Sequence, residues 1–349
     1  MITEAIGKLV ERKNLGASEA EEAMREIMRG GATEAQIAGF LVGLRMKGET
    51  IEEIAAFARV MRENCVKVDL AHVKDKNLLI DTCGTGGDKI KTFNVSTCVA
   101  FVLAGAGMVV AKHGNRAITS KAGSADVLEA LGVNLNLEAG KTAALIEKVG
   151  IAFLFAPLFH PAMKYAGKTR KDLEARTVFN LLGPLTNPFG AKRQVVGVYD
   201  DALVEKVAGV LVELGCEHGF VVHGVDGLDE VSVVGKTNAC EILGGKIRKC
   251  TFSPEDFGVK KASVNEIAGG DAKENAKIIV QILKGVKGAK RDIVIANSAL
   301  ALIAADKVKD TKEGARMAQE IIDSGKALEK LKLLVKESNG DTGKLGEFL

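Results

Sequence analysis

The spacing of hydrophobic residues along the chain changes near residue 70. In residues 1–68 the apolar side chains recur every three or four positions, which predicts amphipathic helices. Ser18, Thr33 and Thr50 each stand near the start of such a stretch, with Glu or Gln three residues later, the pattern of a reciprocal helix cap. Glycines follow the first two stretches and offer a left-handed exit. The predicted helices cover 21–30, 36–48 and 52–64.

From about residue 76 short aliphatic runs alternate with helix-like stretches. The strand-like runs are 77–81, 108–112, 151–156, 194–200 and 219–224, and the helix-like stretches between them include 124–132, 141–150 and 202–215. This alternation predicts a mostly parallel central sheet with helices on both faces. The C-terminal third, 272–338, is expected to be helical cover for the sheet.

Residues 165–188 break this rhythm. They read as one charged amphipathic helix that ends in Gly and Pro, and we expect it to leave the sheet and pack with the N-terminal helices. The predicted fold class is therefore α/β, with a small all-helical domain and a larger α/β domain. The helical domain would comprise 1–70 with 160–187 returning to it, and the α/β domain 71–159 and 188–349.

Length and composition add limits to this picture. A chain of 349 residues is longer than one core usually holds, so two domains are expected. The 48 basic and 45 acidic side chains nearly cancel, which gives no reason to expect a nucleic acid or an anionic membrane as partner. A phosphate-bearing small molecule would need only a local positive patch.

Two features bear on the cellular compartment. The uncharged run 92–111 is nominally long enough to span a bilayer, but it contains Asn94, Ser96 and glycines, so a buried helix followed by a buried strand is favoured. The six cysteines are widely spaced, without a Cys-x-x-Cys pair, and no signal-like apolar segment stands at the N-terminus. We therefore expect reduced thiols and a cytoplasmic protein.

The stretch "GTGGD", 84–88, follows a predicted strand, and "NVST", 94–97, precedes a helix-like run. Glycines let backbone N–H groups converge on an anion, and a helix N-terminus favours phosphate. The stretch matches neither the dinucleotide-binding nor the P-loop pattern. Taken alone, it is compatible with a tight turn and with a phosphate cradle.

Three further groups of residues follow predicted strands or lie on the interrupting helix. Lys112, His113, Asn115 and Arg116 stand at the carboxyl end of a strand, where open parallel sheets bind ligands. Asp229 and Glu230 are neighbouring acids that could hold Mg²⁺ beside a polyphosphate. Arg170 could bind a carboxylate with two hydrogen bonds. Singly, His113 fits a structural loop histidine, the acids fit a surface pair, and Arg170 fits a solvated helix arginine.

Taken together, these motifs resemble the anthranilate phosphoribosyltransferases. The resemblance rests on "GTGGD…NVST", "KHGNRAITSKAGSADVLEALG", "FHPAMK", "RTVFNLLGPLTNP" and "GLDE", which occur in the family's order and cover essentially the whole chain. It implies a fold of the nucleoside phosphorylase/phosphoribosyltransferase type and homodimers that associate through the helical domain. It also implies transfer of a phosphoribosyl group from 5-phosphoribosyl 1-pyrophosphate to anthranilate, with Mg²⁺, in tryptophan biosynthesis.

The resemblance also implies roles for individual residues. For the phosphoribosyl donor they are Gly84, Thr85, Gly86, Gly87, Asp88, Thr92, Asn94, Ser96, Thr97, Lys112 and Ser124. For anthranilate they are Gly84, His113, Asn115, His160, Arg170 and Gly183, with Arg170 facing the carboxylate. For Mg²⁺ they are Ser96, Asp229 and Glu230. Cys83, Lys89 and Lys91 depart mildly from common forms of the loop.

No dedicated acid or base stands out, because an arylamine is already a nucleophile; Lys112 is expected to stabilise the charge of departing pyrophosphate. Two other functions stay open. A pyrimidine-nucleoside phosphorylase shares the fold, although its phosphate loop differs. A transferase-like protein without catalysis that binds nucleic acid would show a basic groove and a degraded donor site.

Overall fold

A seven-stranded sheet forms the centre of the molecule. In the computed structural model, which describes residues 1–87, 90–117 and 121–349, the strands lie in the order β3-β2-β1-β4-β5-β6-β7. The first five strands in this order, from β3 through β2, β1 and β4 to β5, are parallel. β6 and β7 follow antiparallel at one edge. Their bounds are β1 (Leu79–Asp81), β2 (Val109–Gly114), β3 (Ile151–Phe155), β4 (Arg193–Gly197), β5 (His218–Gly224), β6 (Thr237–Leu243) and β7 (Lys246–Phe252). The mostly parallel sheet is confirmed.

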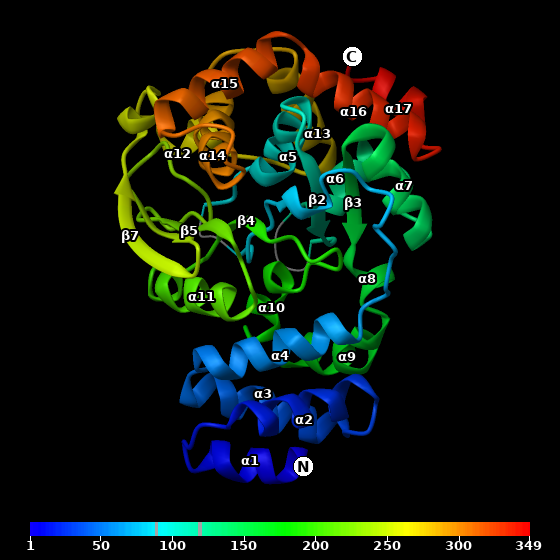
Figure 1. The fold of residues 1–349 in the computed structure, drawn as a ribbon, viewed down its shortest axis with the longest axis vertical. Coiled ribbons are helices and arrows are strands. Elements are labelled where there is room, and N and C mark those ends of the chain that lie inside the picture. The colour runs from blue at the N-terminus through cyan, green and yellow to red at the C-terminus, as the bar shows by residue number, and fades with distance from the viewer. Residues whose placement is uncertain (88–89, 118–120) are drawn as a thin grey trace.

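Helices cover both faces of the sheet (Figure 1). On one face α5 packs on β2, and α14 packs on β4 and β5. On the other face α11 lies between the sheet and the helical bundle, since it contacts β5, β6 and α4. These helices and their neighbours are α5 (Val95–Gly105), α6 (Ser124–Ala130), α7 (Ala139–Val149), α11 (Ala202–Glu213), α12 (Val264–Ile267), α13 (Ala272–Leu283), α14 (Ala289–Ala304), α15 (Thr311–Asp323), α16 (Lys326–Glu337) and α17 (Thr342–Gly346).

The bundle stands below the sheet in Figure 1 and holds the N-terminus. Its members are α1 (Ile2–Val10), α2 (Ala17–Met28), α3 (Glu34–Lys47), α4 (Ile51–Glu63) and α9 (Lys164–Leu173). α9 packs on α2 and α3, which lie more than 100 residues before it in the sequence. The short α8 (Ala156–Phe159) and α10 (Phe179–Leu185) connect this excursion to the sheet, and three single turns complete the chain: η1 (Lys76–Leu78), η2 (Pro161–Met163) and η3 (Pro254–Phe257).

The caps predicted for two bundle helices are confirmed. The Gln36 N–H donates to the Thr33 hydroxyl at 3.2 Å, and the Thr33 N–H donates back to the Gln36 side chain at 2.9 Å. Thr50 and Glu53 exchange the equivalent bonds at 3.1 and 2.8 Å. The cap predicted at Ser18 is wrong. That helix begins earlier, at Ala17, because the N–H of the preceding glycine donates to the Glu19 carboxylate at 3.0 Å.

Glu53 also joins three parts of the bundle. Its carboxylate is fully buried and accepts from the Leu15 N–H at 2.8 Å and from the Lys47 ammonium at 2.9 Å. The Lys47 side chain is itself only 4% exposed. Removing one partner of such a pair would leave an uncompensated buried charge.

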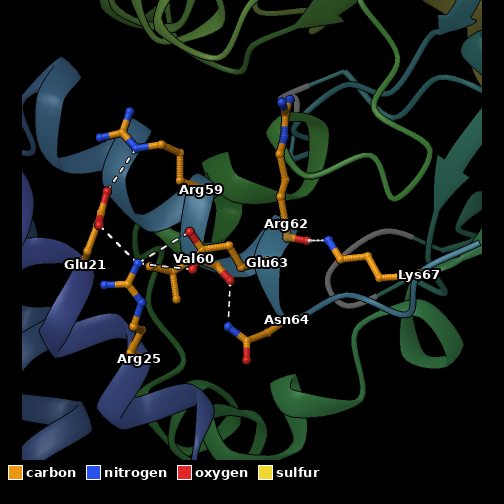
Figure 2. Close-up of polar contacts among 8 residues, drawn as sticks. All are labelled: Glu21, Arg25, Arg59, Val60, Arg62, Glu63, Asn64 and Lys67. Atoms are coloured by element: carbon orange, nitrogen blue, oxygen red, sulfur yellow. Dashed lines mark hydrogen bonds and ion pairs between the residues drawn. The ribbon is translucent and has the colours of Figure 1, made fainter.

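Polar contacts between side chains also join α2 to α4 (Figure 2). Glu21 accepts from Arg59 at 3.0 Å and from Arg25 at 3.1 Å, and Arg25 reaches Glu63 at 3.1 Å. These partly exposed pairs contribute about 0–1 kcal/mol each. Arg62 has a different role. Its guanidinium donates to the carbonyls at the ends of α10 and α11, so it connects the bundle to the sheet side of the molecule.

The structure corrects two expectations about secondary structure. Residues 165–188 form two helices, because Glu174 adopts a left-handed conformation (φ 46°) that ends α9. The β6–β7 hairpin was not predicted, although Gly244 and Gly245, both with positive φ, form the kind of two-residue turn that joins antiparallel strands.

The uncharged run 92–111 forms α5 and the first part of β2, as a buried helix followed by a strand. Among the described residues, no helix combines the length and apolar character needed to cross a membrane. All six cysteines are free thiols.

Candidate active site

The glycine-rich loop crosses the carboxyl ends of β1, β4 and β5. The Thr85 N–H donates to the Gly197 carbonyl at 2.9 Å, and the Gly86 N–H donates to the Asp229 carboxylate at 2.7 Å. A Cβ on Gly84 would stand 3.1 Å from that same carboxylate. Gly86 has a φ of 67°, which L side chains rarely adopt. The loop thus needs its glycines, and Asp229 fixes its position. Asp88 and Lys89 lie outside the described residues.

The start of α5 borders this loop. Asn94 precedes the helix, and both ends of its amide are bonded within the protein, to the Ala122 carbonyl at 3.2 Å and to Asn275 at 3.0 Å. Thr92 forms a β-bridge with Ala268. The Thr97 hydroxyl is buried without a hydrogen bond.

Lys112 stands in β2 beside the loop and is only 3% exposed. Its ammonium donates to the Thr82 carbonyl at 3.1 Å. Nearby, the fully buried Asp81 accepts from the backbone N–H groups of Thr82 at 2.7 Å and His113 at 3.2 Å. Its second oxygen accepts from the Asn187 amide at 2.8 Å. Burial raises the pKa of Asp81, while the Lys112 charge and these bonds oppose the shift.

His113 and His160, two of the residues predicted to bind the acceptor anthranilate, lie side by side. Their ring centroids are 5.2 Å apart, and the His113 Nδ1 lies 3.0 Å from the Gly183 carbonyl. That carbonyl can only accept, so Nδ1 carries the proton and Nε2 presents a lone pair. Both Nε2 atoms are buried and unpartnered. Burial lowers the pKa of His113 to about 3 and that of His160 to about 4, so both rings are neutral near pH 7.

Arg170, in α9, is half-buried, and its guanidinium lies over the Phe179 ring at 5.0 Å. It makes no hydrogen bond with any described residue, and burial lowers its pKa. Phe179 and Gly183 are one turn apart in α10, so they share a face. α10 therefore touches both Arg170 and His113 and brings the acceptor-side residues together.

The residues after β2 are more exposed. Asn115 faces solvent, its side chain accepts from the Arg116 N–H at 2.8 Å, and the Ser124 hydroxyl approaches its carbonyl at 3.4 Å. Arg116 does not add free charge to the site, because it pairs with Asp126 and Glu129 on α6 at 3.1 and 2.8 Å.

Ser96, Asp229 and Glu230 were predicted to bind Mg²⁺. Ser96 and Glu230, together with Gly84, line one small pocket. Its volume is about 10 Å³, room for about one water molecule. Asp229 adjoins this pocket through Gly84, and burial raises its pKa. Within 1–87, 90–117 and 121–349, no three His, Cys, Asp or Glu side chains converge as a metal site. Hard oxygen donors in small number fit Mg²⁺, which takes further ligands from substrate oxygens.

Sequence reasoning missed three residues at this site. Asp81 and Asn187 form the buried network beneath Lys112, and Arg176 contacts the Gly87 carbonyl. The position of Asp81 at the end of a strand was a usable signal, since that edge carries ligand sites. Arg176 and Asn187 lie in the motif "RTVFNLLGPLTNP", but the sequence assigned a role to neither.

Comparison with known proteins gives first the class and then the family. The family model described as "Glycosyl transferase family, a/b domain" matches residues 76–328, and "Glycosyl transferase family, helical bundle domain" matches 3–65. The chain is thus a glycosyl transferase built from these two parts.

Individual relatives are more specific. An anthranilate phosphoribosyltransferase of Desulforamulus reducens is 52% identical over 344 residues, covering 99% of each chain. The crystal structure of anthranilate phosphoribosyltransferase from Thermus thermophilus is 42% identical with a TM-score of 0.90, over 96% of this chain and 99% of that one. The enzyme from Saccharomyces cerevisiae in complex with phosphoribosyl pyrophosphate and Mg is 30% identical with a TM-score of 0.85, over 97% and 98%. The chain belongs to the anthranilate phosphoribosyltransferase family.

Proposed function

We propose that this chain transfers the phosphoribosyl group of 5-phosphoribosyl 1-pyrophosphate to the amino nitrogen of anthranilate. The products are N-(5-phosphoribosyl)anthranilate and pyrophosphate, in tryptophan biosynthesis. The observation that carries this proposal is that the residues expected to bind the donor and those expected to bind the acceptor converge at one edge of the sheet. The glycine loop is bonded to Asp229 on the donor side, and His113 is bonded to Gly183 of the returning segment on the acceptor side.

On the donor side, the loop from Gly84 to Gly87 and the start of α5 would hold the pyrophosphate and ribose. Lys112 is buried beside the loop, where a charge acts more strongly than in water. As the bond from ribose to pyrophosphate breaks, the sugar becomes oxocarbenium-like and the leaving group gains charge. Lys112 stabilises that charge, and removal of one such donor typically costs about 3–4 kcal/mol.

On the acceptor side, positioning replaces base catalysis. Arg170 offers its unbonded guanidinium to the anthranilate carboxylate, and the neutral rings of His113 and His160 add no positive charge beside the amine. The amine attacks C1 of ribose as the bond from C1 to pyrophosphate breaks, and the nitrogen then releases its extra proton to solvent. Holding two substrates in line can supply roughly 7–11 kcal/mol of the barrier reduction.

Ser96, Asp229 and Glu230 would hold Mg²⁺. When bound, Mg²⁺ supplies positive charge that neutralises the pyrophosphate oxygens. Asp229 has a second task in this chain, because it also accepts from the Gly86 N–H and so keeps the glycine loop in place.

Anthranilate fluorescence tests the reaction directly. The full-length chain is mixed with anthranilate, phosphoribosyl pyrophosphate and Mg²⁺, and we expect the fluorescence to fall as the amine is consumed. Parallel samples contain thymidine or uridine with inorganic phosphate. Release of free base there, without any loss of anthranilate, would instead identify a nucleoside phosphorylase.

We also propose a homodimer formed through the helical domain, comprising 1–70 with 160–187, and a cytoplasmic location. Val10 of α1 and Val42 and Met46 of α3 are exposed apolar side chains on that domain, which supports association there. The small residues of α3 are used within the chain, since Gly39 and Gly43 face Ile6 and Leu9. Light scattering on the wild type and on a Met46→Glu variant would test the dimer.

A further inference from the structure

Arg176 connects the acceptor half of the molecule to the donor loop. It lies between α9 and α10, in the segment that joins the bundle to the sheet. Its guanidinium donates to the Gly87 carbonyl and lies 4.1 Å from the centroid of the Tyr199 ring, just beyond β4. One side chain from the returning segment thus reaches both the glycine loop and the end of a central strand.

The charge of Arg176 is not neutralised by contact. A guanidinium has five N–H donors, and within the part of the chain that the structure describes the Gly87 carbonyl is its hydrogen-bond acceptor, with no carboxylate in ion-pair distance. Arg116 offers the contrast, because it is also exposed at this sheet edge but is paired with Asp126 and Glu129. Arg176 therefore retains both charge and free donors at the mouth of the loop.

The aromatic ring beneath the guanidinium favours binding. Tyr199 holds the long Arg176 side chain by a cation–π contact, so less side-chain freedom is lost when an anion binds. Planar guanidinium groups bind phosphate oxygens with two parallel hydrogen bonds, which a lysine cannot do. The expected ligand is thus a phosphate or pyrophosphate group held by the loop beside it.

We propose that Arg176 binds the pyrophosphate group of the phosphoribosyl donor and thereby ties the acceptor-bearing segment to the loaded donor loop. This inference rests on the proposed function for the identity of the donor. Arg176 immediately precedes the residues that lead into α10, which contacts Arg170 and His113. Donor binding at Arg176 consequently fixes the element on which the acceptor site is built.

Two measurements on the full-length chain test this inference: calorimetric binding of inorganic pyrophosphate with Mg²⁺, and steady-state kinetics with the phosphoribosyl donor varied. Arg176→Gln removes the charge, and Arg176→Lys keeps the charge without the planar group that makes two parallel hydrogen bonds. Arg316→Gln is the matched control, because Arg316 is an exposed arginine on α15, away from the site. We expect Arg176→Gln to weaken pyrophosphate binding and raise the donor KM by about 10- to 100-fold, the range for a lost charge-assisted hydrogen bond. Arg176→Lys should fall between, and Arg316→Gln should stay within about twofold of the wild type.

Thermal unfolding of each variant shows whether it is folded, and the lysine variant provides the test should Arg176→Gln unfold. Unchanged pyrophosphate binding in a folded Arg176→Gln or Arg176→Lys variant would overturn the inference, as would an equal loss in Arg316→Gln. Failure of the proposed function looks different. In that case the wild type would bind pyrophosphate in an Arg176-dependent manner but would not consume anthranilate.

Discussion

Acidification should destabilise this protein through its two buried histidines. The pKa of His113 is about 3 and that of His160 about 4 in the folded state, against about 6.5 in an unfolded chain. Between these values the unfolded state binds protons that the folded state does not. Stability is therefore fully present above about pH 6.5 and is lost as the pH falls toward the folded-state values.

The magnitude follows from the pKa difference. At pH 5.0 the unfolded histidine is about 1.5 pKa units above the ambient pH, and each unit corresponds to about 1.36 kcal/mol. Each buried histidine then removes about 2 kcal/mol of stability relative to pH 7.5. His113→Gln abolishes one of these terms, and the amide of Gln can still donate to the Gly183 carbonyl that His113 contacts.

Denaturant unfolding at pH 7.5 and pH 5.0 measures the effect. The loss of unfolding free energy between the two pH values should be about 2 kcal/mol smaller for His113→Gln than for the wild type. His72→Gln is the matched control, because His72 is an exposed histidine, 46% accessible, and its variant should lose as much as the wild type. A His113→Gln curve parallel to the wild type, or an NMR titration midpoint of His113 near pH 6.5, would refute the reasoning.

Three further predictions concern individual side chains. Arg170→Ala should raise the anthranilate KM by at least about tenfold while lowering kcat far less, and an unchanged KM in steady-state kinetics would remove Arg170 from the acceptor site. Asp229→Asn combined with Glu230→Gln should abolish Mg²⁺-dependent turnover, so normal rates across a Mg²⁺ titration would contradict the metal role. Glu53→Ala should reduce the unfolding free energy by about 3–5 kcal/mol because it leaves the buried Lys47 unpaired, whereas Glu22→Ala, at an exposed position of α2, should change it by about 0.5 kcal/mol or less.

Much of the fold followed from patterns that local physics controls. Thr33 and Thr50 signal their helices because the cap and the residue three positions later are bonded directly to each other. The prediction at Ser18 was wrong because the same type of cap forms two residues earlier, where the N–H of Gly16 donates to the Glu19 carboxylate. The end of α9 at Glu174 could not be predicted from the sequence, because a left-handed conformation at a non-glycine residue does not change the spacing of hydrophobic residues.

The β6–β7 hairpin was missed for a related reason. β7 is an exposed edge strand, so its side chains do not alternate between apolar and polar, and only the two glycines of the turn were readable. At the site, motifs placed Lys112 and Asp229 beside the loop, where the structure also has them. Asp81, Asn187 and Arg176 depend on contacts between segments distant in sequence, which a single chain pattern does not encode.

The return of α9 and α10 to the bundle affects the order in which the protein can fold during synthesis. Ala166 and Leu182 are buried in one core with residues of α1–α4, and side chains of β4, α11, β5 and β6 complete it. The first four helices pack on one another, but they leave the ribosome before these further partners exist. The apolar surface that these partners cover stays exposed until the ribosome has passed β6. The N-terminal segment is thus made first but completed late, and nascent chains are exposed to aggregation in the interval.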